Sequence, residues 1–152
     1  MSFRLFTVAL FVSLTLIECS TKDYNNASDK NLSAQSRVEK FEYSGYSDTI
    51  FALIDGKVYE PVKNSNGIDT LLPLSQADVK VSENGAKTVT DENGEFGIWL
   101  GKGTFTLEIK KEGYEPITLT NYVSDPDQIS FAKIILVKGK KQRTFEIPKW
   151  TR

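Results

Sequence analysis

The middle of the chain is built from short segments in which apolar and polar residues alternate. Between residues 50 and 137 such segments recur every 8–14 residues and stop at Gly, Asn, Asp or Pro. The clearest case is Phe105, Leu107 and Ile109, each followed by a polar residue. A period of two places alternate side chains on one face of a strand, and no window keeps a 3.6-residue period. The pattern therefore predicts an all-β protein.

About seven strands are expected, arranged as an antiparallel β-sandwich with one core. Gly56 in the first strand indicates a bulge or bend, and residues 61–73 are expected to form a polar loop. Asn84-Gly85 and Asn93-Gly94 are typical of tight hairpin turns. The expected strands are residues 50–59, 78–81, 87–90, 96–100, 105–110, 114–120 and 129–137.

The N-terminus has the pattern of an export signal. Arg4 precedes an uncharged, apolar run of 13 residues, 5–17. A transmembrane helix needs about 20 apolar residues, whereas this length suits the central region of a secretory signal peptide. We expect residues 1–18 to be a signal peptide.

The run ends in Leu16-Ile17-Glu18-Cys19, which resembles the lipobox of bacterial lipoproteins. The resemblance implies that Cys19, the only cysteine, is acylated and anchors the chain in the outer membrane. Glu18 departs from the pattern, since Gly, Ala or Ser is usual there, and ordinary cleavage to a free secreted domain is the alternative. Lys22-Asp23 resembles the surface-export signal of Bacteroidota lipoproteins, or it is simply part of a polar tether.

The segments on either side of the strands differ from them in composition. Residues 19–48 are rich in Ser, Asn, Asp and Lys and are expected to be a flexible tether, with 41–46 docking or pairing as an edge strand. Residues 138–152 hold six basic residues and one acidic residue, a net charge of +5. This tail either binds an anionic partner or packs on the acidic body with 144–147 as an edge strand. The candidate contacts for an anionic partner are Lys138, Lys140, Lys141 and Arg143.

Composition removes several kinds of chemistry. The chain has no histidine and one cysteine, which excludes Ser-His-Asp and Cys-His nucleophiles, histidine zinc sites and internal disulfides. A net charge of −1 argues against nucleic-acid binding. Asp91, Asn93 and Glu95 resemble a calcium loop, but the twelfth position holds Lys102, so a hairpin turn is preferred. We expect no cofactor, no metal and no catalysis.

Four segments in fixed order carry a family resemblance. Residues 74–81, 88–98, 103–109 and 113–114 are similar to the carboxypeptidase regulatory-like domain. The resemblance implies a transthyretin-like β-sandwich over residues 49–137, of a kind repeated in extracytoplasmic proteins of Bacteroidota and serving without catalysis. Gln76 stands where that family commonly has Gly.

Aromatic residues supply the candidate ligand contacts. Trp99 has the opposite parity to Phe96 and Ile98, which directs it outward. With Tyr122 and Trp150 it is a candidate for an aromatic platform that stacks on sugar rings, and packing against the domain is the alternative.

These patterns together favour a non-catalytic, membrane-anchored β-sandwich module for binding or assembly at the bacterial cell envelope. Its partner is expected to be an envelope protein or a glycan. The alternatives are a glycan-binding surface lipoprotein of a polysaccharide-uptake system and a secreted, unlipidated β-domain.

Overall fold

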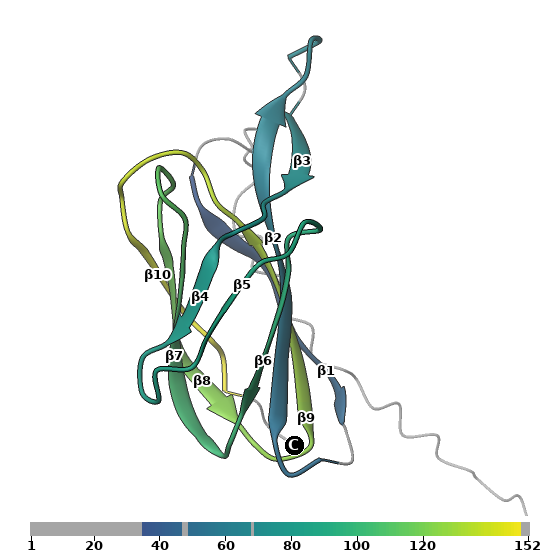
Figure 1. Ribbon diagram of the computed structural model, residues 1–152, viewed down its shortest axis with the longest axis vertical. Coiled ribbons are helices and arrows are strands. Elements are labelled where there is room, and N and C mark those ends of the chain that lie inside the picture. The colour runs from purple at the N-terminus through teal and green to yellow at the C-terminus, as the bar shows by residue number, and fades with distance from the viewer. Residues whose placement is uncertain (1–34, 47–48, 68, 150–152) are drawn as a thin grey trace, which may run out of the picture.

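The computed structural model describes residues 35–46, 49–67 and 69–149, and this part of the chain contains ten strands (Figure 1). The strands form two sheets that pack face to face as a sandwich, which confirms the predicted fold class. Their bounds are β1 Arg37–Tyr46, β2 Ala52–Lys63, β3 Asp69–Pro73, β4 Asp78–Val81, β5 Lys87–Val89, β6 Glu95–Leu100, β7 Gly103–Lys110, β8 Ile117–Ser124, β9 Gln128–Ile135 and β10 Arg143–Glu146.

The first sheet is organised around β2. One side of β2 pairs with β9, which in turn pairs with the edge strand β1. The other side pairs with β6 along its first half and with β3 along its second half. The second sheet has the order β10-β8-β7-β4-β5. Most pairs are antiparallel, as expected, but β2–β9 and β8–β10 are parallel.

The core lies between the two sheets, and the predicted alternation decides which side chains enter it. Phe96, Ile98 and Leu100 of β6 are buried, whereas the residues between them are exposed. Gly56 lies at a regular position of β2, paired with both Phe96 and Ala132, so the predicted bulge there is wrong. A Cβ at Gly56 would clash with the Phe96 ring and lie 2.6 Å from the Ala132 carbonyl oxygen. This glycine lets Phe96 pack across β2.

The sandwich extends beyond the limits of 49 and 137 that the sequence predicts. Residues 37–46 were expected within the tether, with an edge strand as an alternative for 41–46 only, and they form β1 and bury Val38 and Phe41. Residues 143–146 of the basic tail form β10. The predicted loop 61–73 is also different, because β2 continues to Lys63 and pairs with β3. That hairpin projects beyond the core, which explains its polar sequence (Figure 1).

A side-chain contact at Asp91 and the backbone conformation at Gln76 explain two local features of the chain. The Asp91 Oδ1 atom accepts hydrogen bonds from the N–H groups of Asn93 and Glu95, at 2.9 and 2.8 Å. The carboxylate therefore holds the predicted hairpin turn. Gln76 has a φ of +53°, in the left-handed region where glycine is favoured. This conformation gives a physical reason for the glycine that the resemblance expects at position 76.

The strand directions give the sandwich two distinct ends (Figure 1). At the upper end lie the start of β1, the connection 136–142 and the turn 111–116. At the lower end lie the end of β1, the start of β2 and the end of β6. Within the described ranges, no helix is long and apolar enough to cross a membrane.

Candidate functional site

Trp99 lies on the outer face of the first sheet, near the lower end. Its side chain is 53% exposed, because the alternation of β6 that buries Ile98 and Leu100 turns Trp99 outward. Trp99 pairs with Leu53 of β2, and Leu53 pairs with Ile129 of β9. These three side chains form an apolar row across three strands.

Further large apolar side chains are exposed at the lower end. Tyr46 ends β1, Ile50 and Phe51 precede β2, and their exposed fractions are 61%, 77% and 47%. Ala52, which follows Phe51, pairs with Leu100, so Phe51 and Trp99 flank one paired position. We call Tyr46, Ile50, Phe51 and Trp99 the apolar end. Large apolar side chains that are exposed at one end of a domain are candidates for an interaction site.

Asp55 lies one row above Trp99 on the same outer face. It pairs with Gly97 on one side and with Phe131 on the other. A Cβ at Gly97 would lie 2.9 Å from Asp55 Oδ1, so the missing side chain leaves room for the carboxylate. Burial raises the pKa of Asp55 above its ordinary value, and the negative charge of Glu95 adds to the rise. Asp55 is a carboxylate acceptor with apolar neighbours.

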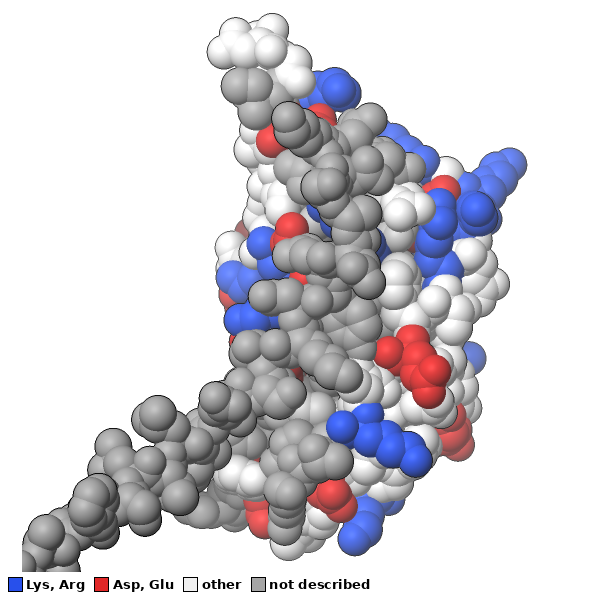
Figure 2. Space-filling view, turned by 180° about the vertical axis from the view of Figure 1, so that it is seen from behind, with Lys and Arg blue, Asp and Glu red and all other residues white. Residues whose placement is uncertain are grey.

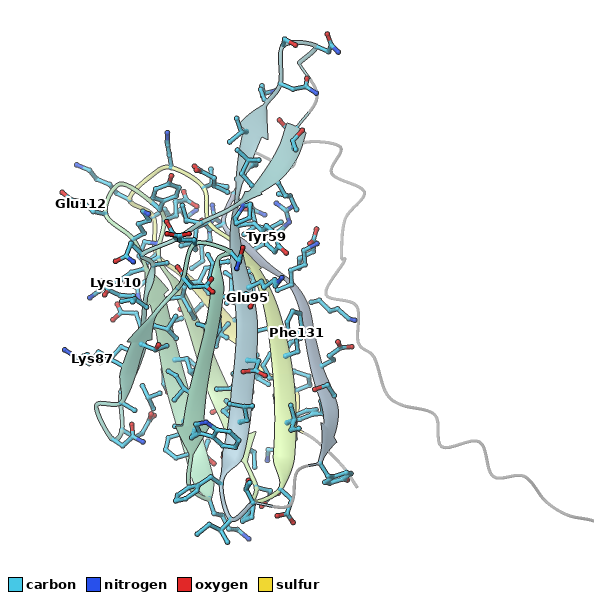
Figure 3. All side chains as sticks on the ribbon, turned by 45° about the vertical axis from the view of Figure 1, so that its right-hand side comes forward. Tyr59, Lys87, Glu95, Lys110, Glu112 and Phe131 are labelled. Atoms are coloured by element: carbon cyan, nitrogen blue, oxygen red, sulfur yellow. The ribbon has the colours of Figure 1, made fainter. Side chains whose placement is uncertain are left out.

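The upper part of this face is occupied by ion pairs. The Lys57 Nζ atom lies 2.6 Å from Glu95 Oε1, and the Lys133 Nζ atom lies 2.6 Å from Glu39 Oε2. Lys133 also lies 5.3 Å from the centroid of the Tyr59 ring. Figure 3 shows Tyr59, Glu95 and Phe131 on this face. Because each lysine has a carboxylate partner, positive and negative charges cancel on this face above Asp55. Below Asp55 the face is apolar.

The structure corrects the prediction for Tyr122. Its side chain is fully buried, its hydroxyl lies 3.1 Å from Ser130 Oγ, and burial raises its pKa to about 12. The reason is a register shift between β7 and β8 beside Asn121, which has a φ of +61°. The shift changes the inward parity of β8 after Leu119, so Tyr122 points into the core. Tyr122 cannot stack on a ligand at the surface.

The other predicted site residues are only partly covered by the structure. Cys19 and Trp150 lie outside the described residues. Lys138, Lys140 and Lys141 are exposed at the upper end, where Figure 2 shows basic side chains projecting at the upper right. Arg143 differs from these lysines, because its Nε atom lies 3.2 Å from Glu115 Oε2. Its guanidinium holds β10 to the domain, which agrees with the alternative that the tail packs on the body.

Sequence reasoning missed Asp55, Ile50 and Phe51. Ile50 and Phe51 were placed inside the first strand, whereas β2 begins at Ala52. The alternation along this strand could have indicated them. Because Ile54 and Val58 point into the core, residues 51, 53 and 55 must point outward. In the described ranges, no three acidic, cysteine or histidine side chains gather as metal ligands.

The fold and this surface define a β-sandwich domain with exposed apolar side chains at its lower end. Residues 54–143 match the CarboxypepD_reg-like domain, and the chain belongs to this family of regulatory-like domains, which are typically non-catalytic. The match runs from the first half of β2 to the first residue of β10. A search of curated proteins finds none that matches the sequence.

Proposed function

We propose that the protein is a non-catalytic binding module, held at the bacterial cell envelope by an acylated Cys19, that binds an envelope protein through the apolar end. The observation that carries this proposal is the exposure of four large apolar side chains together at the lower end. Ile50 and Phe51 are aliphatic and aromatic surfaces of the kind that protein interfaces bury at their centres.

The position of the chain before β1 supports the same proposal. The described chain begins at Gln35, at the upper end, whereas the apolar end lies at the other end of the sandwich. An anchor at Cys19 would therefore be joined to the sandwich at the end opposite the apolar end. The lipobox resemblance and Lys22-Asp23 support an outer-membrane lipoprotein of the Bacteroidota type.

Site-specific photo-crosslinking in cells tests the binding surface. A benzophenone amino acid at Phe51 is expected to give a discrete adduct that disappears when Trp99→Ser is added. The matched control is the same photoprobe at Val89, which is 47% exposed, as Phe51 is, but lies on β5 of the other sheet. An identical adduct pattern at Val89, or none at Phe51, contradicts the proposal.

A glycan ligand is the second candidate, and the adjacent rows of Trp99 and Asp55 favour it. An indole ring stacks on the C–H face of a sugar, and a carboxylate accepts hydrogen bonds from its hydroxyls. Calorimetric titration with polysaccharides is expected to show binding that Trp99→Ala abolishes and Trp99→Phe largely keeps. If none of the tested glycans binds, the glycan ligand is rejected. A soluble, unacylated product would instead support the secreted β-domain.

A further inference from the structure

Three lysines in the connection between β9 and β10 form a separate basic surface. We call Lys138, Lys140 and Lys141 the basic loop. All three side chains are exposed, and no carboxylate in the described part of the chain pairs with them. In this they differ from Lys57 and Lys133 on the outer face, each of which has an acidic partner.

The basic loop begins beside the point where the chain enters the sandwich. The Val137 N–H donates a hydrogen bond of 2.8 Å to Ser36 Oγ, and Ser36 Oγ donates to the Glu115 carbonyl oxygen at 3.1 Å. Lys138 directly follows Val137 and forms an isolated bridge with Tyr114. Ser36, near the start of the described chain, and the first lysine of the basic loop therefore lie at the same place on the domain.

Two carboxylates near the basic loop already have partners. Glu115 pairs with Arg143, and Glu60 accepts a hydrogen bond from the Tyr114 hydroxyl. Lys111 adds a further positive charge to the upper end, where its Nζ donates to the Ser75 carbonyl oxygen. Glu112 is the remaining acidic residue of the turn beside the basic loop, and it is exposed. Among the charged side chains named here, the positive ones outnumber the negative ones.

We infer that the basic loop contacts the anionic phospholipid head groups of the membrane that holds the anchor. Its three exposed lysines lie within four consecutive positions, which suits a layer of phosphate groups. Cys19 lies only 16 positions before Gln35 in the sequence, and Ser36, next to Gln35, lies beside the start of the basic loop. This contact would orient the sandwich with the apolar end away from the lipid. The inference rests on the proposed anchoring for its biological setting.

Vesicle binding by a chain that starts at Ser20 tests the contact without the anchor. All ten described strands lie within residues 37–146, so this chain keeps both sheets. We expect co-sedimentation with vesicles of phosphatidylglycerol and phosphatidylcholine at low salt, and none with phosphatidylcholine alone. Replacing all three lysines of the basic loop by Gln should weaken the binding about a hundredfold, since each lysine near a charged surface contributes about a fivefold factor.

The matched control is Lys80→Gln/Lys87→Gln/Lys102→Gln, which removes three exposed lysines elsewhere and changes the net charge equally. It should bind like the unchanged chain, and both variants should unfold at the temperature of the unchanged chain. Equal weakening in the two variants, full binding by the basic-loop variant, or no binding by the unchanged chain overturns the inference. The tested chain lacks Cys19, so none of these results depends on acylation. A failure of the vesicle binding can therefore be distinguished from a failure of the proposed anchoring.

Discussion

The Arg143 Nε atom lies 3.2 Å from Glu115 Oε2, and both side chains are largely buried, with exposed fractions of 22% and 13%. The same Glu115 oxygen accepts a hydrogen bond of 3.2 Å from the Ser36 N–H. One carboxylate thus joins the start of β1, the turn before β8 and the start of β10. The first and the last of these segments are the ones by which the sandwich exceeds its predicted limits.

Glu115→Ala is therefore expected to destabilise the protein by about 1–2 kcal/mol, because it leaves a guanidinium and an N–H without their acceptor. Urea unfolding followed by fluorescence measures the change. The matched control is Lys40→Gln, which breaks the more exposed pair with Glu42 and should cost less than about 0.5 kcal/mol. Equal effects of the two substitutions would contradict the role given to Glu115.

Gly56→Ala should destabilise the sandwich by about 3 kcal/mol, the upper range for overpacking a well-packed core. The added methyl group meets the Phe96 ring and, at 2.6 Å, the Ala132 carbonyl oxygen, and a backbone atom cannot move aside as a side chain can. Gly45→Ala on β1 is the control, since nothing lies within 4 Å of a Cβ there. Thermal unfolding should separate the two variants, and similar midpoints would refute the close packing at Gly56.

Gln76→Gly is expected to stabilise the protein by up to about 1 kcal/mol. Gln76 has a φ of +53°, and a residue with a Cβ pays a steric cost in this region that glycine avoids. Part of the gain is lost to the greater freedom of glycine in the unfolded chain. Gln76→Ala keeps the Cβ and should leave the free energy of unfolding nearly unchanged. A glycine variant no more stable than the alanine variant would contradict this explanation.

The stability of the protein should fall as pH rises from about 10 to about 12. Burial raises the pKa of Tyr122 to about 12, so in this window the unfolded chain has lost a proton that the folded chain keeps. Fewer protons on the unfolded state mean that the free energy of unfolding decreases, by about 1.4 kcal/mol per pH unit for this group. Tyr122→Phe should remove this part of the slope, and an unchanged slope would contradict the assignment.

Local patterns predicted the central strands because their chemistry is local. β6 and β7 alternate without interruption, and the turn at Asp91 is formed by residues within four positions of it. The sequence also predicted an outward Trp99, which the structure confirms. In these elements one residue's direction follows from its neighbours along the chain.

The remaining features depend on contacts between distant segments. β1 buries Val38 and Phe41, three positions apart, because a register shift after Val38 breaks the period of two. The shift beside Asn121 reverses the parity of β8 in the same way and hides Tyr122. The site shows the same limit, because Asp55 faces Gly97 only through the pairing of β2 with β6. No alternation within one segment can show such relationships.

Intact-mass spectrometry of the protein from the membrane fraction tests the central claim, an envelope module anchored through Cys19, most directly. The claim predicts a chain that begins at Cys19 and carries the added mass of two or three acyl chains. Cys19→Ala should abolish the modification and release the domain from the membrane. A chain without acyl groups in the soluble fraction, for the unchanged protein as well as for Cys19→Ala, would contradict the anchored account.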